Sequence, residues 1–167
     1  MTDSDKILIY GYGNPGRQDD GLGAAFIQKV DDFIIQNTLH HIVTDCNYQL
    51  NIEDADTVSK ATAVVFVDAS QEENIEHFSL SEVDASDARV EFSMHAVSPS
   101  FVIDLCRKIY GVTPIAWLIH IKGYEWDFKE EMSEKAKENL EMAFDFFKPF
   151  LLTKQPLTLI NALTTEN

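Results

Sequence analysis

The stretch KILIYGYGNPGRQDDGLGAAF, residues 6–26, joins an apolar segment to a glycine-rich turn and then to a second apolar segment. The first part predicts a β-strand, and the last part predicts the start of a helix. Gly11, Gly13 and Gly16 also have the G-x-G-x-x-G spacing that opens many dinucleotide-binding domains. The stretch therefore predicts a strand, a turn and a helix, and it raises the question of whether a nucleotide binds there.

Strand and helix patterns alternate along the rest of the chain. Strands are predicted at residues 6–12, 41–45, 62–69 and 114–122, with a weaker one at 89–93. Helices are predicted from Asp19 or Asp20 to about 36, from about 51 to 60, from Ser98 to Gly111, and over 130–151. The alternation, with the continuous apolar run VVFV in the third strand, predicts a three-layer α/β/α sandwich around a mostly parallel twisted sheet of about five strands.

Length and composition favour one domain spanning residues 1–167. The chain has 167 residues, of which 45% are hydrophobic, and this is enough for a substantial core. The acidic segment 71–87 is weakly periodic, so we expect a solvated insertion there. No apolar run approaches the roughly 20 residues of a membrane helix, and the acidic N-terminus is unlike a signal peptide. We expect a cytoplasmic protein.

The charge balance excludes some partners. Thirteen basic residues against 28 acidic ones leave a formal charge of −15, which opposes binding to nucleic acid and to anionic membranes. A metal ion, a cationic peptide segment or solubility alone remain as interpretations of this charge.

Ionisable side chains follow three of the predicted strands. Asp19 and Asp20 come after the first strand, Asp68 ends the strand containing VVFV, and His95 follows the weak strand at 89–93. Ligands of open parallel sheets bind beyond the carboxyl ends of the strands, so we expect Asp20, Asp68 and His95 to meet at one edge. Two carboxylates and an imidazole could hold a divalent ion such as nickel, zinc or iron. Taken alone, each residue is more often a helix cap, a turn residue or a loop histidine than a metal ligand.

Two other kinds of site are compatible with parts of the sequence. Asp45, at the end of the second strand, suits the ribose of a dinucleotide, but Asp19 and Asp20 would lie where the phosphates belong. Each pair of like charges about 5 Å apart costs on the order of 3 kcal/mol at an effective dielectric constant near 20. A Ser-His-Asp triad of Ser70, His95 and Asp68 is the second alternative, but no G-x-S-x-G motif accompanies it.

The motif GYGNPGRQDDGLG, with the downstream VVFVDAS and SMHAVS, resembles the maturation proteases of nickel-iron hydrogenases. These endopeptidases trim the C-terminal extension of the hydrogenase large-subunit precursor. The resemblance implies an α/β/α sandwich and places the metal-contacting residues of the family at Asp20, Asp68 and His95. It also implies that the nickel is carried by the precursor, and that other divalent ions can occupy the site in vitro.

The resemblance further implies that the large-subunit precursor is the partner of the chain, and we expect the chain to be monomeric by itself. The metal would act as a Lewis acid or supply an activated water. The alternative from a different class is a non-catalytic metal-binding or maturation-partner protein on the same fold.

Overall fold

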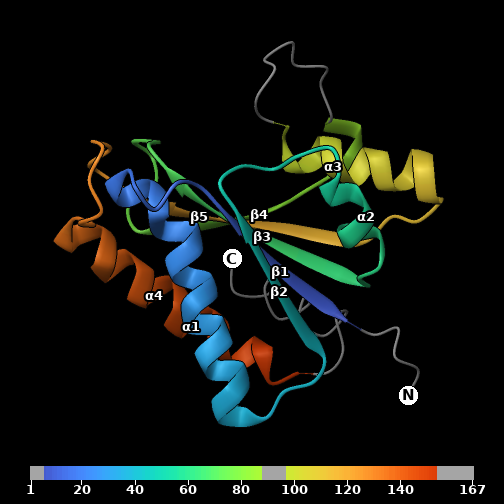
Figure 1. Cartoon of the computed structure of the whole chain (residues 1–167), viewed down its shortest axis with the longest axis horizontal. Helices are drawn as coiled ribbons and strands as arrows, with labels where there is room; N and C mark the ends of the chain where they lie inside the picture. Colours follow the sequence, from blue (N-terminus) through green and yellow to red (C-terminus); the bar gives the residue numbers. More distant parts are fainter. Residues whose placement is uncertain (1–5, 88–96, 154–167) are drawn as a thin grey trace.

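The computed structural model describes residues 6–87 and 97–153, which form a five-stranded sheet in the order β2-β1-β3-β5-β4 (Figure 1). Four strands run parallel: β1 (Ile7–Tyr12), β2 (Ile42–Asn47), β3 (Ala63–Ser70) and β5 (Ile115–Lys122). The edge strand β4 (Phe78–Glu82) pairs antiparallel with β5. The prediction of a mostly parallel sheet of about five strands is confirmed within the described residues.

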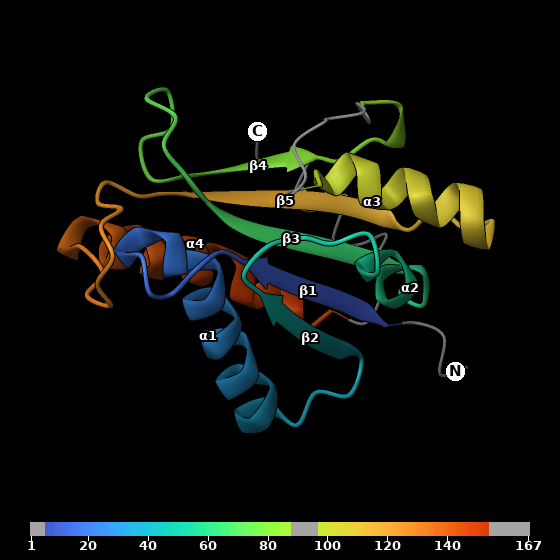
Figure 2. The same ribbon diagram turned by 45° about the horizontal axis from the view of Figure 1, so that its top comes forward.

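Helices cover both faces of this sheet. On one face α1 (Leu22–Asn37) packs beside α4 (Glu134–Leu151). On the other face α2 (Asp54–Ser59) packs beside α3 (Pro99–Leu105), which continues as a π-helical turn, η3 (Cys106–Tyr110). Figure 2 shows the sheet between the two pairs of helices. The predicted three-layer α/β/α sandwich is confirmed, and none of the described helices is both long and apolar enough to cross a bilayer.

The apolar run in β3 is explained by the two halves of the core. Val65 and Val67 belong to the cluster packed against α1 and α4, whereas Val64 and Phe66 belong to the cluster packed against α2 and α3. All four are 0% exposed. Each such burial contributes about 1.5–3 kcal/mol, so the run holds both helical layers on the central strand.

The prediction for the acidic segment 71–87 is wrong over part of its length. Residues Phe78–Glu82 form β4, and its Phe78 and Leu80 pack against the core on the α1 and α4 face. The sequence FSLSE alternates apolar and polar residues, which is the pattern of a strand with one buried face. The predicted weak strand at 89–93 lies outside the described residues.

Two of the predicted helix starts are corrected by the structure. A short 3-10 turn, η1 (Gln18–Gly21), precedes α1, and neither Asp19 nor Asp20 caps that helix with its side chain. The last helix begins after Ser133, whose Oγ accepts a hydrogen bond from the Ala136 N–H at 3.3 Å, and not at residue 130.

The other helix signals agree with the structure. Ser98 caps α3 by accepting a hydrogen bond from the Phe101 N–H at 3.1 Å, and Gly111 ends η3 in the left-handed conformation. In α4 the apolar residues that recur at three- and four-residue steps form a buried stripe: Ala136, Leu140, Ala143 and Phe147.

The glycines of the first turn bring the end of β1 against the start of α1. Gly13 has φ +132°, and a Cβ there would lie 2.1 Å from the Asp20 carbonyl oxygen. A Cβ on Gly11 would lie 2.4 Å from the Gly23 carbonyl oxygen. The G-x-G spacing therefore meets a packing requirement between β1 and the η1–α1 segment.

Gly13→Ala should lower the free energy of unfolding by on the order of 3 kcal/mol, because the methyl group collides with backbone in a conformation that L-residues rarely adopt. Gly111→Ala is the matched control. Gly111 also has positive φ, +68°, but no atom lies within 4 Å of the position that a Cβ would take there, so the cost should be about 1 kcal/mol. Urea unfolding measures both, and equal losses would contradict the close approach of Gly13 to Asp20.

Candidate functional site

The site lies where the strand order reverses direction. From β1 the chain goes first to β2 on one side and later to β3 on the other, so the carboxyl ends of β1 and β3 form a topological switch point. Ligands of open α/β sheets bind in the crevice at such points. Asp20 follows β1, and Asp68 is near the end of β3. The third predicted site residue, His95, lies outside the described residues.

Asp68 is held in an environment that favours its neutral form. Burial raises the pKa of the Asp68 carboxyl to about 7, and the negative charge of nearby Asp20 adds to the rise. Hydrogen bonds from the Ala69 N–H, at 2.8 Å, and from the Tyr12 hydroxyl act in the opposite direction. A carboxyl with a pKa near neutrality can accept or release a proton at physiological pH, as acid–base catalysis requires.

Asp20 is partly buried and close enough to Asp68 for its charge to raise the pKa of Asp68. Its Oδ2 accepts a hydrogen bond from the Asn14 N–H at 2.8 Å, which orients the carboxylate at the end of the β1 turn. No ion pair within the described residues involves Asp20 or Asp68. The two carboxyl groups therefore supply oxygen atoms and negative charge without an ion-paired lysine or arginine in the described part of the chain.

Asp19 has a different role from its neighbour. It is 0% exposed, and its carboxylate accepts hydrogen bonds from the N–H groups of Tyr124, Glu125 and Ser133 and from the Ser133 hydroxyl, at 2.7–3.0 Å. Burial alone would raise the pKa of Asp19, but these hydrogen bonds outweigh it and hold the pKa below its usual value. Asp19 thus fixes the β5–α4 loop against η1, whereas the Asp20 carboxylate bonds the Asn14 N–H and raises the pKa of Asp68 through its charge.

The glycine-rich turn does not present the groups that a pyrophosphate needs. The N–H of Gly13 donates to the Asn47 carbonyl, that of Asn14 to Asp20, that of Gly16 to the Asn14 side chain, and that of Arg17 to the Asn14 carbonyl. Pro15 has no N–H to offer. Every backbone donor of residues 13–17 already has a partner in the protein, which argues against the dinucleotide alternative.

Ser70, the serine of the alternative triad, forms a hydrogen bond within a turn. Ser70 is 6% exposed, and its Oγ accepts a hydrogen bond from the Glu72 N–H at 3.1 Å. A nucleophilic hydroxyl needs contact with a base and access to substrate, and the described part of the chain gives Ser70 neither.

The described residues do not by themselves complete a metal site. Among them, no group of three His, Cys, Asp or Glu side chains is placed to hold a metal ion. Asp20 and Asp68 form an incomplete pair of oxygen ligands, so a bound ion needs further ligands from elsewhere in the chain or from a second molecule.

Comparison with solved structures identifies the same fold in a group of processing enzymes. The NiFe hydrogenase maturation protease HycI from Thermococcus kodakarensis KOD1 has a TM-score of 0.69 and 22% identity, covering 89% of this chain and 93% of that one. The chain shares its fold with hydrogenase maturation proteases.

Two further solved structures of hydrogenase maturation enzymes share the fold of this chain. The hydrogenase maturating endopeptidase HybD from E. coli has a TM-score of 0.65 at 12% identity, covering 84% of this chain and 88% of that one. The hydrogenase 2 maturation peptidase from a Thaumarchaeota archaeon has a TM-score of 0.63 at 17% identity, covering 89% and 99%. No protein-family model and no curated protein sequence matches the chain. At these identities the likeness establishes the fold, and the activity has to be argued from the site.

Asp68→Asn should stabilise the protein at alkaline pH. Between about pH 4 and 7 the unfolded chain releases the Asp68 proton while the folded chain keeps it, so the free energy of unfolding falls across this range. The variant should therefore exceed the wild type by about 2–4 kcal/mol at pH 8 and by almost nothing at pH 4. Urea unfolding at both pH values measures this, with the exposed Asp32→Asn as control. A gain that is independent of pH would contradict the assigned environment of Asp68.

Asp19→Asn should lower the free energy of unfolding by on the order of 3 kcal/mol at pH 7, because the amide group meets N–H donors where the carboxylate accepted them. Amide hydrogen exchange should show the N–H groups of Tyr124 and Ser133 losing protection before the strands do. Unchanged protection at these two positions would show that Asp19 does not hold the loop.

Proposed function

We propose that the chain is an endopeptidase that removes the C-terminal extension of a NiFe hydrogenase large-subunit precursor after nickel insertion, acting in the cytoplasm. The proposal rests on one observation above all. Asp20, in the turn after β1, and Asp68, near the end of β3, lie close enough for the charge of Asp20 to raise the pKa of Asp68, and no positive side chain among the described residues forms an ion pair with either. The shared fold with maturation proteases supports the same conclusion.

The nickel belongs to the substrate in this proposal. A divalent ion at the edge of the sheet neutralises the two carboxylates, and its charge favours ionisation of Asp68, whose pKa is about 7 in the free chain. Asp20 and Asp68 would each add an oxygen ligand to an ion that the precursor already holds, and His95 would add a nitrogen ligand.

The reaction is hydrolysis of one peptide bond. The oxygen of a water molecule bonds to the scissile carbonyl carbon, the C–N bond breaks, and the departing amine takes up a proton. Asp20 and Asp68 position the scissile peptide through the shared ion, and such positioning can supply several kcal/mol of the barrier reduction. A precursor without nickel gives the two carboxylates nothing to bind, so cleavage would report that nickel has been inserted.

Purified chain mixed with nickel-loaded precursor should produce a large subunit shortened at its C-terminus, and nickel-free precursor should stay intact. Mass spectrometry of the two mixtures measures this. Cleavage of both precursors would contradict the recognition of nickel. Binding without cleavage of either would favour the non-catalytic maturation partner.

Asp20→Asn, Asp68→Asn and His95→Ala should each reduce processing by at least about 100-fold, since each removes one proposed ligand of the ion. Asp45→Asn is the matched control, because Asp45 lies in the last part of β2 and its Oδ1 accepts a local hydrogen bond from the Cys46 N–H. The control should process at the wild-type rate. Normal processing by any of the three ligand variants would remove that residue from the site.

A further inference from the structure

The β5–α4 loop, residues 124–133, carries exposed aromatic side chains. Its sequence YEWDFKEEMS has aromatic residues at alternate positions 124, 126 and 128. Phe128 is 86% exposed, the largest exposed fraction among the big apolar side chains of the described residues, and Tyr124 is 39% exposed. Large aromatic side chains on a surface are typical of protein–protein contact sites.

The loop is fixed in place although most of it is neither helix nor strand. The Gln18 N–H donates to the Lys129 carbonyl at 2.8 Å, and the Asp19 N–H donates to the Glu125 carbonyl at 3.0 Å. The Gln18 side chain bonds the loop at three further points, and the Asp19 carboxylate accepts four hydrogen bonds from it. A loop held in this way loses little conformational entropy when a partner binds.

Phe128 itself is positioned by Arg17, the residue just before η1. The Arg17 guanidinium carbon lies 5.1 Å from the centre of the Phe128 ring, and Arg17 Nη2 donates to the Trp126 carbonyl at 3.2 Å. The ring is therefore supported on one side by a cation–π contact and still presents most of its surface to solvent.

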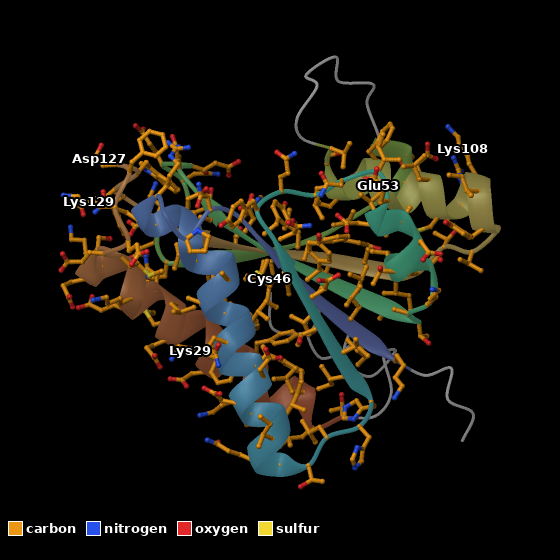
Figure 3. All side chains as sticks on the ribbon, in the orientation of Figure 1. Lys29, Cys46, Glu53, Lys108, Asp127 and Lys129 are labelled. Atoms are coloured by element: carbon orange, nitrogen blue, oxygen red, sulfur yellow. The ribbon has the colours of Figure 1, made fainter. Side chains whose placement is uncertain are left out.

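The loop borders the edge that holds the two site carboxyl groups. It starts beside the end of β3, where the Gly123 N–H donates to the Ser70 carbonyl at 2.9 Å, two residues beyond Asp68. Its other anchor, Asp19, directly precedes Asp20. In Figure 3 Asp127 and Lys129 lie at the outer side of this loop, away from the sheet.

The charge of the loop indicates the chemistry of its partner. Residues 124–133 carry four carboxylates, at Glu125, Asp127, Glu130 and Glu131, and one ammonium group, at Lys129, for a net charge of −3. All five side chains belong to exposed residues. An apolar ring in a loop of net negative charge complements a surface with an apolar recess and a basic rim.

We propose that residues 124–133 are the docking surface for the large-subunit precursor, which presents an apolar recess for Phe128 surrounded by lysine or arginine side chains. This inference rests on the proposed function for the identity of the partner. The fixed loop binds the precursor beside Asp20 and Asp68, so that docking and contact with the nickel occur together.

Phe128→Ala should weaken binding of nickel-loaded precursor about tenfold, and raise KM by a similar factor with kcat nearly unchanged. Ile35→Ala is the matched control. Ile35 is also highly exposed, at 77%, but it lies near the C-terminal end of α1, whereas η1 and the loop lie at the N-terminal end. Surface plasmon resonance measures binding, and mass spectrometry measures cleavage. Wild-type affinity of Phe128→Ala would overturn the proposal.

The double variant Asp127→Asn and Glu130→Gln tests the charge. It should weaken binding at low salt and reduce the loss of affinity as the salt concentration is raised from roughly 50 to 300 mM, because two attractive charges are gone. Asp32→Asn, on an exposed part of α1, should change neither. A salt dependence identical to that of the wild type would contradict the proposal that lysine or arginine side chains of the precursor surround the recess.

Measuring binding and cleavage separately distinguishes the docking proposal from the proposed function. Weakened binding by Phe128→Ala in a chain that never cleaves the precursor would support the docking surface and contradict the protease. Cleavage by the wild type with unaltered binding by Phe128→Ala would support the protease and contradict the docking surface. Failure of the wild type to bind any precursor would contradict both.

Discussion

The buried carboxylate of Asp19 joins the η1 turn to the β5–α4 loop through four hydrogen bonds, two of them from Ser133. The site depends on this connection. It fixes the turn that carries Asp20, it holds the loop that carries Phe128, and Ser133 in turn caps α4. A buried carboxylate whose oxygens are all satisfied stabilises the fold, whereas an unsatisfied one would cost several kcal/mol.

In Asp68, unlike Asp19, hydrogen bonds do not outweigh the cost of burying the charged form. Asp68 is partly buried and near Asp20, without an ion-pair partner among the described residues, and its raised pKa is an energetic cost to the free protein above pH 7. Such a cost is common where a site is built for a ligand that is absent from the free state. In our account the ligand is the nickel of the precursor, whose charge offsets the repulsion between the two carboxylates.

Much of the fold could be predicted from the sequence because the strongest patterns report burial. The continuous apolar run VVFV of β3 is buried on both faces, and the apolar residues of α4 at three- and four-residue steps are buried on one face. The strand β4 escapes prediction because its alternating pattern is short and lies inside an acidic segment. The cap predicted at Asp19 is wrong because the groups that it binds, at Tyr124 to Ser133, are more than 100 residues away in the chain.

The candidate site could be predicted only in part. Because both residues follow strands, the sequence predicts that Asp20 and Asp68 lie at one edge of the sheet. It does not tell which acid of the pair Asp19-Asp20 is buried and which lies near Asp68. The G-x-G-x-x-G spacing is ambiguous for a similar reason, since close packing of a helix on a strand and binding of a pyrophosphate both require glycine. The proposed docking surface could not be predicted, because the sequence 124–133 alone has the pattern of an acidic, aromatic linker. The loop is fixed by hydrogen bonds to Gln18 and Asp19, which are distant in the chain.

X-ray absorption at the nickel edge tests the central claim most directly, because it reports the ligands of the ion before any bond is cleaved. Spectra of nickel-loaded precursor should change when the wild-type chain is added, with new oxygen ligands on the nickel, and Asp20→Asn or Asp68→Asn should remove part of that change. An unaltered nickel spectrum in a complex that demonstrably forms would contradict the account.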